Sequence, residues 1–176
     1  AVMGDIGVAT ESDVWSMHWN PAKYGFVKQD FGLGITYTPW LRNLNVKDIF
    51  ITNLAAFKRI DKMQVLGASF KYFSLGNVYF TNSAGVETGE VFSPRELSLD
   101  FAYARLLSKD FSFSIAMRYI YSNLTGGATS EAGAKSQPAQ SGAADISGSY
   151  QKDKTIGAIP TNLRFGFNIS NVGAKV

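Results

Sequence analysis

The stretch LSLDFAYARLLSKDFSFSIAMRYIYS, from Leu97 to Ser122, decides the fold that the sequence predicts. Its two halves alternate between apolar and small or polar residues, and a short link at 108–110 joins them. The apolar positions are Leu97, Leu99, Phe101 and Tyr103 in the first half and Phe113, Ile115, Met117, Tyr119 and Tyr121 in the second. Because successive side chains of a β-strand point to opposite faces, the pattern predicts a hairpin with one apolar face and one polar face.

Two kinds of fold would remove the apolar face from water. A soluble sandwich would bury it against a second sheet. A membrane barrel would present it to lipid and keep the small and polar residues inside. On any single strand the two alternatives give the same pattern.

The connections between strands separate these alternatives. Further strands are expected at 31–38, at 49–59, from Gln64 with an extension to Phe80, at 143–151 and at 162–170, which makes seven with the hairpin. The links at 61–63 and 108–110 are short, whereas those at 82–96 and 123–142 are long and polar. Short turns at one end and long loops at the other are typical of outer-membrane barrels, so the loop lengths favour the membrane alternative.

The polar face and the composition agree with a barrel. The polar face holds small residues and four charges, Asp100, Arg118, Asp145 and Arg164, which suit a plugged or watery lumen. The chain has 176 residues, 14% of them aromatic, and Tyr37 and Trp40 suit an outer interface belt. The sequence contains no run of about 18 apolar residues, so no transmembrane helix is expected.

Several function classes are excluded or disfavoured. The net charge of +3 comes from scattered Lys and Arg, which argues against nucleic acid as a partner. The absence of cysteine excludes disulfides and thiolate metal sites. No motif for a nucleotide, metal or haem is present, so no cofactor is expected.

The first 30 residues differ from the rest because they do not alternate. Trp15 and Trp19 lie four residues apart, which allows a short helical turn before Pro21. Three carboxylates, Asp5, Glu11 and Asp13, lack the spacing of a calcium loop, and we expect them to pair with wall arginines such as Arg118 or Arg164.

Catalysis is not expected from this segment. His18 is the only histidine, and the neighbouring Ser12 and Ser16 do not lie in a nucleophile elbow of the G-x-S-x-G type. A structural role is expected for His18.

Six segments carry a resemblance to a known family: GDIGVATESDVWSMHWNPAKYGF, ITYTPWLRNL, FKYFSLGNVYF, LDFAYARLLS, MRYIYSNLT and FGFNISNVGAKV. They resemble the PorV (LptO) family of the Bacteroidetes type IX secretion system, FadL-like outer-membrane barrels of about fourteen strands with an N-terminal hatch. The resemblance implies that residues 1–30 form the hatch, with Asn20, Pro21 and Ala22 as its motif. Residues 31–176 would then be the N-terminal half of a transmembrane barrel whose C-terminal strands are absent from this sequence.

The resemblance also implies a function in protein transport. It implies a non-catalytic transport component, because PorV-like proteins associate with the SprA translocon barrel, with cargo bearing a C-terminal signal domain and with the sortase attachment complex. The barrel would sit in outer-membrane lipid with its long loops facing the cell exterior, where Val91, Phe92 and Leu124 are candidate partner-binding residues. The alternatives are a FadL-type channel for hydrophobic small molecules and, less favoured, a lipopolysaccharide deacylase.

Overall fold

The computed structural model describes residues 6–41, 48–81, 85–125 and 137–173, and most of these residues lie in β-strands. Two short helical segments come first, α1 (Ser16–Trp19) and the 3-10 helix η1 (Pro21–Phe26). The strands are β1 (Phe31–Pro39), β2 (Ile49–Arg59), β3 (Gln64–Leu75), β4 (Val78–Thr81), β5 (Glu87–Phe92), β6 (Arg95–Ser108), β7 (Phe111–Asn123), β8 (Ala139–Ile156) and β9 (Ile159–Gly173). Within these ranges, no helix is long and apolar enough to cross a membrane.

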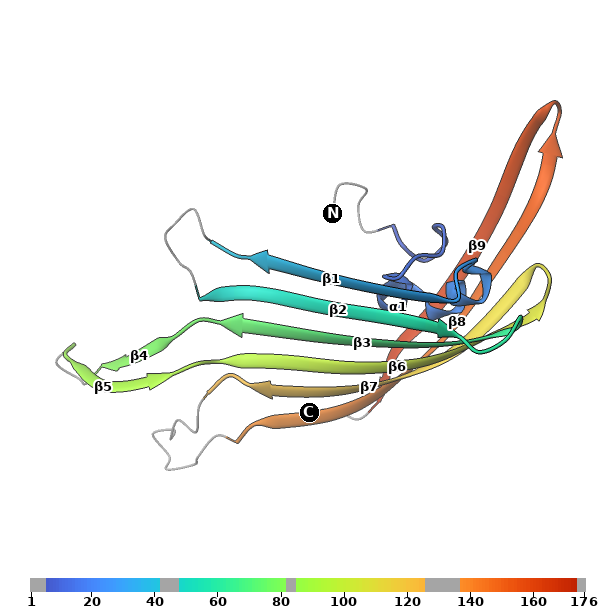
Figure 1. Cartoon of the computed structure of the whole chain (residues 1–176). Coiled ribbons are helices and arrows are strands. Elements are labelled where there is room, and N and C mark those ends of the chain that lie inside the picture. Colours follow the sequence, from blue (N-terminus) through green and yellow to red (C-terminus); the bar gives the residue numbers. More distant parts are fainter. Residues whose placement is uncertain (1–5, 42–47, 82–84, 126–136, 174–176) are drawn as a thin grey trace.

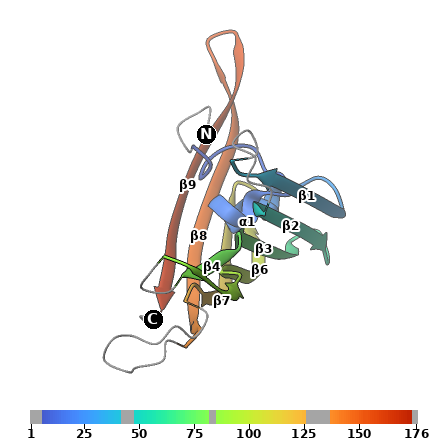
Figure 2. The same ribbon diagram turned by 90° about the vertical axis from the view of Figure 1, so that its left-hand side faces the viewer.

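Seven strands form one antiparallel sheet in the order β1-β2-β3-β6-β7-β8-β9. The sheet curls into a half-barrel, and α1 and η1 lie on its concave face (Figures 1 and 2). The turns after β2, β6 and β8 lie at one end, called here the short-turn end, and the connections after β1, β3 and β7 lie at the other, the long-connection end. The predicted all-β, antiparallel, barrel-like fold is confirmed.

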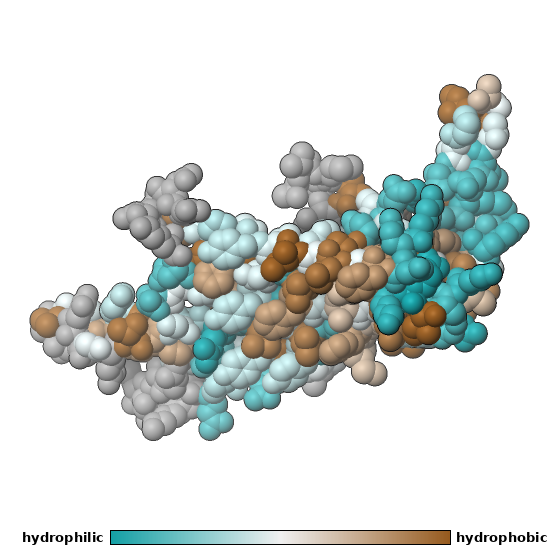
Figure 3. All heavy atoms as spheres, viewed as in Figure 1, coloured by the Kyte–Doolittle hydropathy of each residue, from teal (hydrophilic) through white to brown (hydrophobic). Residues whose placement is uncertain are grey.

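The two faces of the sheet have the opposite exposure to those of a soluble sandwich. On the convex face the apolar side chains are exposed, with Ile35 at 72% and Met117 at 69%. On the concave face Ser112 and Ser147 are fully buried, and Asp100 is only 5% exposed. Brown, hydrophobic residues accordingly gather on the outer surface along the middle of the strands (Figure 3). A whole sheet with its apolar side outward matches a wall that faces lipid.

The connection between β3 and β6 differs from the prediction in two ways. The third strand ends at Leu75 and does not continue to Phe80, because Gly76 adopts a left-handed conformation (φ 85°) that turns the chain out of the sheet. The expected loop 82–96 contains β5, which pairs with β4 in a separate two-stranded sheet. A hairpin therefore stands at the long-connection end where a polar loop was expected (Figure 1).

The last two strands are longer than predicted. The expected strands 143–151 and 162–170 are extended to β8 and β9, which pair up to Ile156 and Ile159. A tight turn at Gly157 (φ 64°) joins them in place of a loop of medium length. The residues of the extension, such as Lys152 and Lys154, are polar and do not alternate with apolar ones, so periodicity alone did not identify them as strand.

Candidate functional site

The centre of the concave face is the segment of residues 6–27, called here the hatch, and its organising residue is Asn20. The Asn20 side chain is fully buried, and its Nδ2 donates to the carbonyl oxygens of Val8 (2.8 Å) and Gly148 (3.0 Å). Its Oδ1 accepts from the backbone N–H of Ala22 (3.0 Å), which caps η1, and Pro21 takes the first helical position. The Asn20 side chain therefore forms hydrogen bonds with the start of the hatch, with the 3-10 helix and with strand β8 of the sheet.

Ala22 extends this attachment into the wall. Its backbone N–H also donates to Ser147 Oγ (3.2 Å), and Ser147 Oγ shares a hydrogen bond with Ser114 Oγ (2.6 Å) on the neighbouring strand. All three residues are essentially inaccessible to solvent. The predicted hatch motif is thus in contact with two wall strands, β7 and β8.

Tyr24 is the main apolar anchor of the hatch. Its ring is fully buried beside Phe57, with the ring centroids 5.3 Å apart, and its hydroxyl donates to the Val14 carbonyl (2.7 Å) and accepts from the Met17 N–H. A Cβ on Gly67 of β3 would lie 2.7 Å from the Tyr24 ring, so this wall position has room only for glycine.

Small residues on the concave face admit the hatch more generally. The buried wall positions around Tyr24 are mostly alanine and serine: Ala55, Ala102, Ala104, Ser112, Ser114, Ala116, Ser147 and Ser149. From the hatch side, a Cβ on Gly25 would come within 2.7 Å of Ser112 Cβ. Tyr24 was not predicted from the sequence, although the run of small residues at concave positions indicated that another part of the chain approaches closely there.

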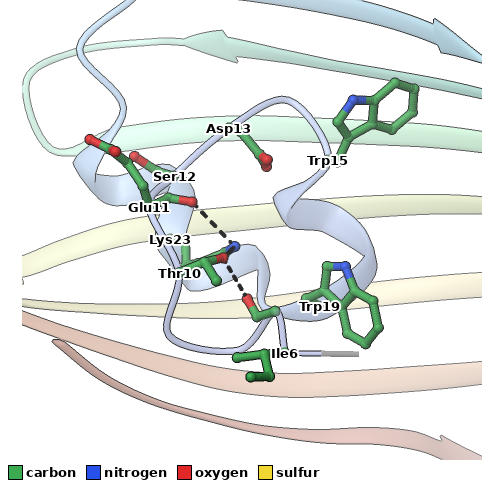
Figure 4. Close-up of a pocket in the computed structure, with 9 residues that line it drawn as sticks. Ile6, Thr10, Glu11, Ser12, Asp13, Trp15, Trp19 and Lys23 are labelled. Atoms are coloured by element: carbon green, nitrogen blue, oxygen red, sulfur yellow. Dashed lines mark hydrogen bonds between the residues drawn. The ribbon is translucent and has the colours of Figure 1, made fainter. Parts of the chain in front are cut away.

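A buried lysine stabilises the first turn of the hatch. Lys23 is 1% exposed, and its Nζ donates to Thr10 Oγ1 (2.9 Å) and to the Glu11 carbonyl (3.5 Å) (Figure 4). Burial lowers the pKa of the Lys23 ammonium, while the Asp13 carboxylate acts in the opposite direction. These residues line a cavity of about 540 Å³ that Trp15 and Trp19 border on the other side.

The four predicted inner-face charges do not form a single group. Arg118 on β7 forms ion pairs with Asp100 on β6 and with Asp145 on β8, the latter at 3.3 Å. Ser69 Oγ donates to Asp100 (2.7 Å), and the Asn171 N–H donates to Asp145 (2.7 Å), so both carboxylates have further donors. Arg118 is thus paired within the wall and not with the hatch, because the register places Asp100 directly beside it.

Arg164 is the inner-face arginine that meets the hatch. Its Nη2 lies 3.8 Å from Glu11 Oε1, while Asp13 accepts a hydrogen bond from Ser16 Oγ at 3.1 Å. Asp5, the third expected hatch carboxylate, lies outside the described residues. A cavity of about 1190 Å³ separates the hatch from the long-connection end, and Lys71, Phe73, Arg118 and Trp19 are among its lining residues.

The candidate partner-binding residues lie at the long-connection end. Val91, 52% exposed, and the half-buried Phe92 belong to β5, and Phe92 pairs with Val78 of β4. Leu124 is exposed just beyond β7. The structure thus puts two of the three in one hairpin and the third after a different strand.

The expected interface aromatics are divided between the two faces. Tyr37 contacts Phe50 (ring centroids 5.3 Å apart), and Phe50 contacts Tyr72 (6.0 Å), which forms a row on the convex face near the long-connection end. Trp40 instead lies 6.1 Å from Phe73, whose side chain belongs to the concave face. The ring contact of Trp40 is therefore with a concave-face residue and not with the aromatic row where an outer belt was expected.

No catalytic or metal-binding arrangement emerges from the described ranges. His18 is exposed, its ring contacts Trp19 edge-on at 4.7 Å, and the nearby Ser16 hydroxyl is directed to Asp13. Within the described ranges no three metal-ligating side chains come together.

An antiparallel half-barrel with an apolar convex face, a polar concave face and an N-terminal hatch is the architecture of a partial transmembrane β-barrel. Over residues 1–176 the sequence matches the family described as Type IX secretion system protein PorV, and the chain belongs to that family. The resemblance noted in the sequence is confirmed, and the family makes the chain a component of type IX secretion. No curated protein matches the sequence.

Proposed function

We propose that the chain is a non-catalytic outer-membrane component of type IX secretion that acts as a binding platform for protein partners. The proposed partners are an SprA-type translocon barrel, cargo with a C-terminal signal domain, and the sortase attachment complex. Family membership supports a role in this secretion system. The exposed convex face supports insertion in lipid, with residues 6–27 as the hatch of the wall.

The observation that carries the proposal is how polar groups are distributed between the concave face and the rim. Inside, Arg118 is paired with Asp100 and Asp145, and Asn20 has three hydrogen bonds, so these central polar groups already have partners within the chain. At the long-connection end, by contrast, the β4–β5 hairpin exposes Val78, Tyr79 and Val91. Apolar side chains on a projecting hairpin are suited to contacting a partner protein.

The wall is proposed to continue beyond the seven strands. The edge strands β1 and β9 carry exposed apolar residues along their convex sides, including Leu33, Ile35, Phe167 and Ile169. Unpaired strand edges are unfavourable in lipid because backbone N–H and C=O groups have no water to bond to. Further strands that pair with both edges would complete a FadL-like barrel with its long connections on the cell exterior.

The test replaces exposed apolar residues at the two ends of the wall. Val91→Asp and Leu124→Asp should each reduce co-purification of the translocon barrel and the release of cargo bearing the C-terminal signal domain. The matched control is Ile156→Asp, at an apolar residue of the short-turn end that is at least as exposed, and it should leave both unchanged. Unchanged association in both of the first two variants would contradict a partner surface at the long-connection end.

A FadL-type channel is the second candidate because of the cavity of about 1190 Å³ above the hatch. Binding of a hydrophobic small molecule there, with secretion unaffected by the Val91 and Leu124 variants, would favour it. A deacylase has less support, because Ser16 hydrogen-bonds Asp13. A His18→Ala variant with normal secretion but lost deacylation would reverse that preference.

A further inference from the structure

The charges on the convex face have a one-sided distribution. Following the alternation of each strand, the convex positions of the seven wall strands hold no Asp or Glu within the described residues. They do hold cations, and all but one of these lie toward the short-turn end: Lys58 on β2, Arg105 on β6, and Lys152 and Lys154 on β8. The concave face carries the carboxylates instead, among them Asp100 and Asp145.

The tilt of a barrel wall brings three of these cations to one level. In barrels the strands tilt by about 35–45° and lie about 4.8 Å apart, so a level line shifts by roughly 1.2 residues per strand. The ladder row through Lys58 passes through Tyr103 on β6 and Ile146 on β8. Two strands on, the level line comes to about Arg105, and four strands on, it comes to within roughly one residue of Lys152.

Apolar side chains lie between these cations. Lys58 is paired across the ladder with Phe31 and Leu66, Arg105 with Phe113, and Lys152 with Leu163. Phe31 and Leu66 are themselves exposed. Lysine and arginine stems can therefore lie along an apolar wall while their charged ends reach outward to the headgroup level. Teal, hydrophilic residues gather at this end in Figure 3, beside the brown band of the strands.

The carboxylates near this rim leave part of the positive charge uncompensated. Asp61 in the β2–β3 turn interacts with Arg105 but is hydrogen-bonded to the turn backbone, and Asp110 lies 3.8 Å from Lys152. Asp30 lies 4.0 Å from Arg59, and Asp153 accepts from Asn162, so neither is paired with a cation of the convex face. Lys58 and Lys154 have no ion-pair partner in the described part of the chain. The turns add two further exposed cations, Lys62 and Lys109.

We propose that this rim, formed by Lys58, Arg105, Lys152 and Lys154, binds the phosphate groups of anionic phospholipids in the leaflet that faces the periplasm. The proposal rests on the proposed location in the outer membrane. Positive side chains at the border of an apolar wall are attracted to anionic headgroups, and an arginine can bind a phosphate in bidentate fashion. The rim would fix the height of the wall in the membrane and thereby the height of the long-connection end.

The test is a lipid titration of the purified full-length protein in detergent, followed by native mass spectrometry. Phosphatidylglycerol should be retained more than phosphatidylcholine of the same chain length. Each loss of a rim cation, in Lys58→Gln, Arg105→Gln or Lys154→Gln, should lower phosphatidylglycerol occupancy roughly fivefold. The conservative Lys58→Arg should retain binding, which separates loss of charge from misfolding.

Arg95→Gln is the matched control because Arg95 lies on the same strand and face as Arg105 but at the long-connection end. It should leave phosphatidylglycerol binding unchanged. Equal retention of the two lipids, an equal effect of Arg95→Gln and Arg105→Gln, or displacement of the lipid by inorganic phosphate at the same concentration would each overturn the proposal. The readout does not depend on secretion, so a failure here is distinguishable from a failure of the partner-binding function.

Discussion

Asn20→Asp separates the two roles of the residue at the centre of the hatch. Aspartate keeps an oxygen that can accept from the Ala22 N–H, so the cap on η1 is preserved. It removes the donor to the carbonyls of Val8 and Gly148 and sets a carboxylate against both oxygens. Asn20 is fully buried, so water cannot replace the lost bonds.

The expected size of the effect follows from the two carbonyls that lose the Asn20 donor. The loss of a partner costs a buried polar group about 1–3 kcal/mol, so the hatch should lose roughly 2–6 kcal/mol of local stability. Since about 1.4 kcal/mol corresponds to a factor of ten, backbone amides in η1 should exchange with deuterium at least roughly 30-fold faster. The Lys23 and Val27 amides, which donate to Asn20 and Tyr24, are the reporters.

The effect should depend on pH in a defined direction. The buried carboxyl of the variant should have a pKa above its unfolded value near 3.9, because burial and the two carbonyls disfavour the anion. The part of the destabilisation that comes from the buried charge is then complete above the folded pKa and is lost as the pH falls through that value toward about 3.9, while the loss of one donor remains. Asn20→Ala, which has no titrating group, should be equally destabilised across this range.

Asn162→Ala is the matched control because Asn162 is exposed and donates to Asp153 at 2.6 Å. It should leave exchange in η1 unchanged. Unaltered exchange of the Lys23 and Val27 amides in Asn20→Asp would refute the anchoring role of Asn20. An equal acceleration in β6 and β7 would show that the residue stabilises the wall as a whole and not the hatch.

Three further variants probe the wall. Gly67→Ala should lower the free energy of unfolding by about 1–3 kcal/mol, because the new Cβ meets the buried Tyr24 ring. Gly142→Ala should not lower it, because the nearest atom to its new Cβ is 3.9 Å away. Equal stabilities of the two variants in denaturant titration would contradict a close approach of the hatch to β3. Arg118→Met should lower the free energy of unfolding by about 3–5 kcal/mol, because it leaves Asp100 and Asp145 buried without a cation. Arg118→Lys should have an intermediate effect. A Met variant as stable as the natural protein would show that the two ion pairs contribute nothing to stability. The backbone N–H of Met63 holds the pKa of Asp61 below its usual value. The β2–β3 turn should therefore be stabilised above about pH 3.9 and lose this stabilisation as the pH falls through the lowered pKa. Exchange of the Gln64 amide, which donates to Asp61, should follow that pH dependence in the natural protein and not in Asp61→Asn.

The wall was predictable where each residue interacts with near neighbours. The alternation from Leu97 to Ser122 predicted two strands, their faces and the turn between them, and the ladder pairs Asp100 with Arg118 as that register requires. Periodicity did not identify the extension of β8 and β9, because Lys152 to Thr155 carry no apolar period and are held by backbone pairing. The β4–β5 hairpin was missed because Gly76 redirects the chain after an apparently continuous strand.

The attachment of the hatch depends on contacts that local patterns do not contain. Asn20 bonds the carbonyl of Gly148, which lies 128 residues further along the chain. The family resemblance placed a hatch at the N-terminus, but the residues that accept it had to be found in the structure. The sequence did contain their complement, the alanines and serines at concave positions of β6, β7 and β8.

These small residues explain why the polar face of the sheet is buried and the apolar face is not. Large side chains at Ala102, Ser114 or Ser147 would fill the concave side and exclude η1, whereas small ones leave a channel that Tyr24 and Met17 occupy. With the hatch in place, the serine hydroxyls bond to each other and to the Ala22 N–H, so no water is needed beside them. The wall therefore packs closely against η1 on its concave side and presents apolar side chains on its convex side, and its two rims are further surfaces that can contact partners. The long-connection rim carries a hairpin with exposed apolar side chains, whereas the short-turn rim carries cations beside apolar residues such as Ile156. The two ends therefore suit different partners: proteins at the first and anionic lipid headgroups at the second.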